Sequence, residues 1–94
     1  MFISYEQAYG GEILQVLENQ GVMGFTKWAG VQGRGTESGL PHYGDHAWPS
    51  LNDAVLTVIP DEKVDAILAE LKDKDEQTPN LGLRAFVWNV EGIY

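Results

Sequence analysis

The residues best suited to bind a ligand lie in one glycine-rich segment. Residues 30–39 read Gly-Val-Gln-Gly-Arg-Gly-Thr-Glu-Ser-Gly. Glycines let backbone N–H groups approach an anion closely, and Arg34 supplies a positive charge. No Gly-Lys-Ser/Thr follows, and the segment leaves a strand for a loop instead of opening a helix, so it is not a Walker motif. Two interpretations stay open: an anion-binding loop, or a turn that needs positive φ angles.

A second candidate is a metal site. Both histidines of the chain fall in residues 42–46, His-Tyr-Gly-Asp-His. Two imidazoles and a carboxylate, from His42, Asp45 and His46, are good ligands for zinc, copper or nickel. The spacing of the histidines suits a metal on a helical turn, but Gly44 disfavours a helix. The alternative is a solvated loop whose histidines cap turns or contact a partner.

Large aromatic residues could also take part in binding. In a small chain they more often fill a core or a subunit interface, and we expect this of Trp28 and Trp88. Tyr43 and Trp48 lie in or beside the histidine segment, and we predict that they contact a partner protein.

The sequence offers little for catalysis. Cysteine is absent, and neither histidine has a serine and a carboxylate at a recognisable spacing. We therefore expect a protein that is not an enzyme. The net charge of −8, with six lysines and arginines, argues against nucleic acid as a partner. The chain has no apolar run of membrane-spanning length and no signal-peptide pattern at its start, so we expect a cytoplasmic protein without membrane insertion.

The elements that must position these residues follow the order β-α-β-β-α-β. Alternation and β-branched content predict strands over 2–8, 22–31, 51–59 and 83–90. Three- and four-residue apolar spacing predicts a helix over 10–20 and a second helix that Pro60 and Asp61 begin and cap, with a polar turn over 75–80. A long loop covers about 33–50. The 94 residues make one domain, 1–94, of the α+β class, a ferredoxin-like sandwich with a four-stranded antiparallel sheet.

The order of elements leaves one face of the sheet without cover. Right-handed crossovers place both helices on the same face. The last strand is apolar on both sides, with Phe86, Trp88 and Val90 on one and Ala85 and Val87 on the other. Such strands are usually buried on both faces. We therefore expect the open face to pack against other copies of the chain.

The chain resembles the PII-like signalling proteins, which are related to the nitrogen regulator P-II and, in trimeric architecture, to CutA-type divalent-cation tolerance proteins. Residues 17–26, Leu-Glu-Asn-Gln-Gly-Val-Met-Gly-Phe-Thr, are similar to the family's first helix end and second strand start. Residues 30–35 resemble the start of its long T-loop. Residues 58–65, Val-Ile-Pro-Asp-Glu-Lys-Val-Asp, are similar to the start of its second helix.

This resemblance implies a homotrimer that binds a small effector, often an adenine nucleotide, in clefts between subunits. The T-loop, about residues 33–50, would report occupancy to a membrane transporter, an enzyme or a regulatory protein. The residues implied to line the cleft are Gly30, Gln32, Gly33, Arg34, Gly35, Gly82 and Arg84.

The segment before the last strand departs from the family pattern. Residues 73–80 read Asp-Lys-Asp-Glu-Gln-Thr-Pro-Asn, which is acidic where the family has a basic, glycine-rich phosphate loop. A polyphosphate would meet repulsion there, so we do not expect tight ATP binding. The alternative interpretation is a CutA-like protein that binds a divalent metal through His42 and His46.

Overall fold

The computed structural model describes all residues from Met1 to Tyr94. Its strands are β1 (Phe2–Glu6), β2 (Thr26–Val31), β3 (Asn52–Leu56) and β4 (Arg84–Phe86), and its α-helices are α1 (Gly10–Asn19) and α2 (Val64–Gln77). The strands form one antiparallel sheet in the order β2-β3-β1-β4. This order confirms the predicted α+β fold of ferredoxin-like type.

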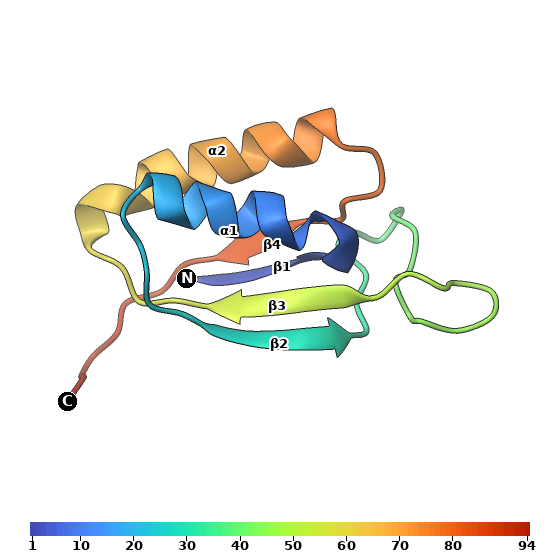
Figure 1. The fold of residues 1–94 in the computed structure, drawn as a ribbon, viewed down its shortest axis with the longest axis horizontal. Coiled ribbons are helices and arrows are strands. Elements are labelled where there is room, and N and C mark those ends of the chain that lie inside the picture. The colour runs from blue at the N-terminus through green and yellow to red at the C-terminus, as the bar shows by residue number, and fades with distance from the viewer.

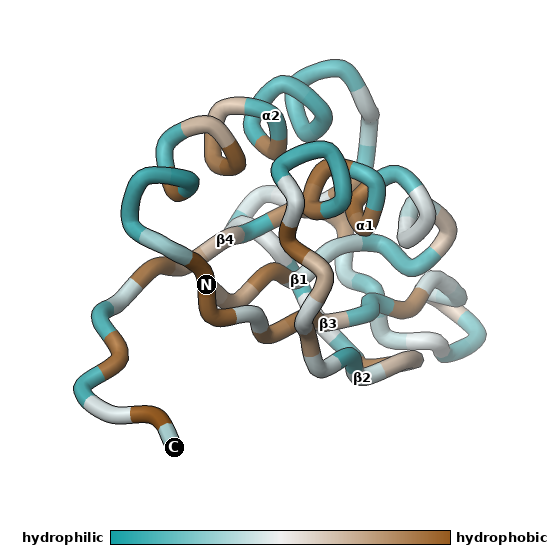
Figure 2. The backbone as a smooth tube through the Cα atoms, turned by 60° about the vertical axis from the view of Figure 1, so that its left-hand side comes forward, coloured by the Kyte–Doolittle hydropathy of each residue, from teal (hydrophilic) through white to brown (hydrophobic).

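Both helices lie on the same face of the sheet, and the opposite face is bare (Figure 1). The core forms between the helices and this face, and the helix surfaces turned away from the sheet are hydrophilic (Figure 2). Ile13 and Leu17 of α1 and Ile67 and Leu71 of α2 are fully buried there. No helix is both long enough and apolar enough to cross a bilayer.

The strands are shorter than the sequence predicted, and the fourth is limited by its pairing with β1. Phe2 pairs with Phe86 on one side and with Leu56 on the other. Beyond Phe86 the chain has no partner strand, so the prediction that the last strand reaches residue 90 is wrong. Residues 87–94 leave the body of the protein as an extended tail (Figures 1 and 2).

Several further boundaries differ from the predictions, and the third strand ends at Leu56 instead of residue 59. The first strand ends at Glu6, whose carboxylate accepts a hydrogen bond from the Ala8 N–H at 2.7 Å and opens a 3₁₀ turn. The second strand begins at Thr26, not at residue 22. The expected polar turn over 75–80 is helical as far as Gln77. A 3₁₀ turn over Asp61–Lys63 precedes α2, and no side chain caps either element.

The strand register fixes what the bare face of the sheet presents. Trp28, Ala54, Ser4 and Arg84 lie side by side across all four strands in one row. The outer positions of this face are open to solvent, since Trp28 is 45% exposed and Phe86 on β4 is 54% exposed. Within the single chain, therefore, nothing covers this apolar surface.

Candidate functional site

A cavity of about 630 Å³ lies on the bare face of the sheet, where the chain leaves β2 for the long loop. Its lining includes six of the seven residues predicted to bind an effector: Gln32, Gly33, Arg34, Gly35, Gly82 and Arg84. Gly30 is not among them. We call this cavity the arginine cleft. Its volume falls within the range of small-molecule sites.

The arginine cleft has an apolar floor and a positive rim. The strands contribute Phe2, Trp28 and Ala54 to its floor. Arg34 and Arg84 are the charged residues of its lining, and no carboxylate is among them. Two guanidinium groups without an acidic partner favour an anionic ligand.

Two glycines hold the two sides of the cleft together. A Cβ atom on Gly35 would overlap the backbone carbonyl of Gly82, so the loop base meets the turn before β4 only because residue 35 has no side chain. Gly82 itself has a φ of +59°, which glycine adopts without strain. The close approach of these two glycines thus places Arg34 and Arg84 in the lining of the same cavity.

The base of the long loop is closed by a buried polar group that the sequence analysis missed. Backbone hydrogen bonds of 2.9 and 2.7 Å join Gly33 and His42. The Asn52 side chain lies beneath them, with Oδ1 2.6 Å from His42 Nδ1 and Nδ2 donating to Ser4 Oγ at 3.1 Å. Asn52 and Ser4 also line the cleft.

Gly30 shapes the cleft without lining it. Its φ is +69°, and its N–H donates to Asp53 Oδ1 at 3.0 Å, at an irregularity in the β2–β3 pairing between Trp28 and Val31. Asp53 is buried and forms a 3.4 Å ion pair with Lys27. The carboxylate therefore fixes the bend from which the chain enters the cleft.

Tyr5 lies opposite Asp53 in the strand register and is fully buried. Its hydroxyl has no hydrogen-bond partner. Burial, and secondarily the Asp53 charge, raises the pKa of the Tyr5 hydroxyl to about 12. The phenol is therefore held in its neutral form under ordinary conditions.

The structure does not bring the three predicted metal ligands together. No group of three histidine, cysteine or acidic side chains is placed to hold a metal ion. His42 is 3% exposed and is engaged by Asn52, whereas His46 lies exposed. Asp45 closes a turn by accepting the Trp48 N–H at 2.7 Å. The predicted metal site at His42, Asp45 and His46 is therefore not formed in this arrangement.

The predicted partner contacts lie on the long loop, which projects from one end of the sheet (Figure 1). Trp48 is 38% exposed, and Tyr43 is partly exposed and bound through its carbonyl to Gln32 Nε2 at 2.9 Å. Trp28 and Trp88 are about half exposed within the single chain, so neither is a core residue.

The sequence profile of one family, described as Nitrogen regulatory protein P-II, matches residues 3–94. Neither the curated proteins nor the solved structures yielded a match. The profile covers both helices, strands β2, β3 and β4, β1 from its second residue, and every residue of the arginine cleft except Phe2. Nothing in the comparisons or in the loop geometry supports the alternative of a CutA-like metal-binding protein.

Proposed function

The chain belongs to the P-II family of nitrogen regulatory proteins, and on that premise we propose that it is a homotrimeric regulator that binds a small anionic effector in the arginine cleft. The observation that carries the proposal is the placement of Arg34 and Arg84 on one cavity at the base of the long loop. The protein acts by binding and not by catalysis.

The bare face of the sheet supports assembly into a trimer. Trp28 and Phe86 are about half exposed at its two edges, and a chain of 94 residues has little core of its own. Packing this face against sister subunits would remove apolar surface from water. It would also place the arginine cleft at a subunit boundary and enclose a ligand bound there.

Effector binding would reach the loop through Arg34. This residue lines the cleft, yet its Nε donates to the Gly39 carbonyl inside the loop at 2.8 Å. A ligand anion that draws the guanidinium into the cleft would compete with that bond. The effector then changes the order of residues 33–50, which present Tyr43 and Trp48 to a partner such as a membrane transporter or a regulatory protein.

The charge of the cleft argues for a small effector anion. Two arginines balance two negative charges, and the neighbouring hollow is lined by Asp75 and Glu76. A long phosphate chain would extend toward these carboxylates and be repelled. We therefore expect AMP or another anion of low charge to bind more tightly than ATP.

A thermal-shift series with AMP, ADP and ATP, each with and without magnesium, tests the proposal. We expect AMP to raise the melting temperature most and Arg34→Ala to abolish the shift. Lys72→Ala is the matched control, since it also removes one positive charge but lies exposed on α2. If no nucleotide shifts the wild-type protein, or if both variants respond equally, the assignment of the arginine cleft fails.

A further inference from the structure

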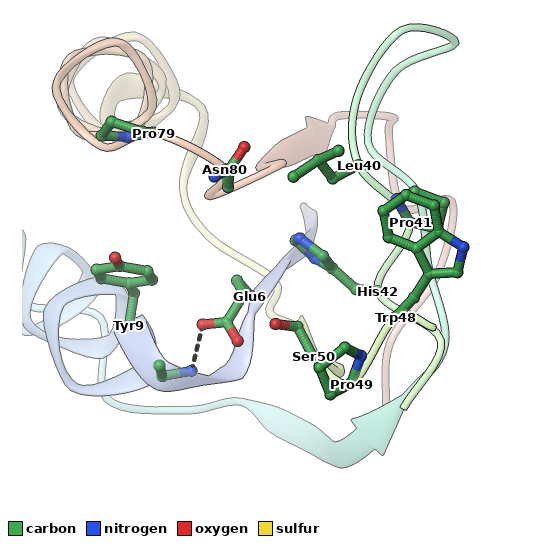
Figure 3. A pocket seen from close by; sticks show the side chains of 11 residues that line it. Glu6, Tyr9, Leu40, Pro41, His42, Trp48, Pro49, Ser50, Pro79 and Asn80 are labelled. Carbon is green, nitrogen blue, oxygen red and sulfur yellow. Dashed lines mark hydrogen bonds between the residues drawn. The ribbon is translucent and has the colours of Figure 1, made fainter. Parts of the chain in front are cut away.

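We propose that the protein has a second small-molecule site, which binds an alkylammonium ion between Glu6 and His42. The site is a cavity of about 390 Å³ that we call the glutamate pocket (Figure 3). Its lining is Glu6, Ala8, Tyr9, Leu40, Pro41, His42, Trp48, Pro49, Ser50, Pro79 and Asn80.

Four segments from three distant parts of the chain build the glutamate pocket. The end of β1 with its 3₁₀ turn forms one wall, residues 40–42 and 48–50 of the long loop form the others, and residues 79–80 close the rim. Asn80 holds a left-handed φ of +63°, which is uncommon outside glycine. The pocket shares no lining residue with the arginine cleft, so it is a separate site.

Two acceptor atoms in the pocket lack partners. His42 Nδ1 lies 2.6 Å from Asn52 Oδ1, an acceptor; in the tautomer that donates through Nδ1, the other ring nitrogen, Nε2, is an acceptor, and it has no protein partner. Glu6 Oε2 accepts the Ala8 N–H, the dashed bond in Figure 3, and Oε1 is not engaged. A ligand that fits these two atoms must be a hydrogen-bond donor.

The charge of the pocket calls for a cation. Glu6 is the charged residue of its lining, and the chain as a whole carries −8. In the arginine cleft the sign is reversed, because Arg34 and Arg84 supply the charge there. An ammonium group placed against Glu6 gains a charge-assisted hydrogen bond, whereas an anion would be repelled.

The remaining walls suit an aliphatic chain. Leu40, Pro41, Pro49 and Pro79 give apolar surface, and the indole of Trp48 stands at the loop side of the pocket (Figure 3). A short alkyl group attached to the ammonium would cover this surface, and an aromatic ring near a cation adds attraction. The combination of one carboxylate, one imidazole acceptor and apolar walls defines an alkylammonium site.

The proposal is tested by titrating the full-length protein with n-butylammonium chloride and, in parallel, with sodium butyrate, following the backbone amides by NMR. We expect saturable shifts centred on Ala8 and Trp48 with the ammonium ion and none with butyrate. Glu6→Gln keeps an acceptor for the Ala8 N–H and removes the charge, and we expect it to weaken binding at least about tenfold. Glu12→Gln, on an exposed part of α1, is the charge-matched control and should bind as the wild type does.

A second variant keeps the test independent of Glu6. Leu40→Trp enlarges a half-exposed side chain that lines the pocket and should block n-butylammonium. Equal shifts with butyrate, unchanged binding by Glu6→Gln, or no saturable shift of the wild type would each overturn the proposal. Because the two cavities share no lining residue, these outcomes would not bear on the proposed function of the arginine cleft, which the nucleotide series tests separately.

Discussion

Replacing Gly33 by alanine probes the polar group that closes the loop. The backbone of Gly33 is not in the left-handed region, so alanine is acceptable there on conformational grounds. The added Cβ, however, would overlap the side-chain amide of Asn52. Asn52 is buried beneath the loop base, so it must leave its place and release both His42 and Ser4.

The cost of Gly33→Ala follows from the bonds that Asn52 loses. The contacts to His42 and Ser4, at 2.6 and 3.1 Å, are each worth about 1 kcal/mol net, so the free energy of unfolding should fall by about 2 kcal/mol. For a domain of this size that corresponds to a melting temperature lower by roughly 8–16 °C. Asn52→Ala should cost about the same, because it removes the same two bonds.

The double variant gives the sharpest result. In Gly33→Ala/Asn52→Ala the overlap no longer exists, so the pair should be about as stable as either single variant and far from additive. Urea unfolding at one fixed protein concentration, followed by circular dichroism, measures this. Gly11→Ala is the control: its Cβ meets no neighbour and should stabilise α1 slightly. Additive losses in the double variant, or a Gly33→Ala change within about 0.5 kcal/mol of wild type, would refute the packing described at Asn52.

Two more predictions concern Tyr5 and Asp53, the buried residues that lie opposite each other on β1 and β3. Since the Tyr5 pKa is raised from 10.0 to about 12, the neutral phenol favours the folded state below pH 10, and this contribution is lost as pH rises from about 10 to 12. Tyr5→Phe removes a buried hydroxyl without a partner, so it should stabilise the protein by about 1 kcal/mol at neutral pH. Above pH 10 the variant should lose less stability than the wild type, as measured by denaturant titrations. Asp53→Ala should lower the free energy of unfolding by about 2 kcal/mol, since the Gly30 N–H loses its acceptor and the Lys27 ammonium loses its ion pair. It should also shift the titration of Tyr5, followed by tyrosinate absorbance, to lower pH. An unchanged Tyr5 titration in Asp53→Ala, or a Tyr5→Phe protein less stable than wild type, would contradict these assignments.

Periodicity was sufficient to predict the fold but not the lengths of its strands. The apolar spacing of Ile13 and Leu17 in α1, and of Ile67 and Leu71 in α2, marks the buried faces correctly. Strand ends depend on partners far along the chain, which no local pattern reports. β4 stops at Phe86 because its partner β1 begins at Phe2.

The glycine-rich segment and Arg84 could be assigned to one site only through the family resemblance, since they are about fifty residues apart. The structure brings them to one cavity, and their ligand stays a prediction. Asn52 could not be identified, because its role depends on where His42 returns to meet Gly33. For the histidine cluster, proximity in sequence suggested a metal site, but in the fold His42 is buried and His46 is exposed.

The central claim is that the bare face of the sheet is an interface between copies of the chain, with the arginine cleft at its boundary. Sedimentation equilibrium over a wide range of protein concentration tests it most directly. The account predicts a species of three times the chain mass of 10.4 kDa, and a shift toward single chains when Trp28→Glu places a charge on that face. A wild-type protein that remains at the mass of one chain across the whole range would contradict it.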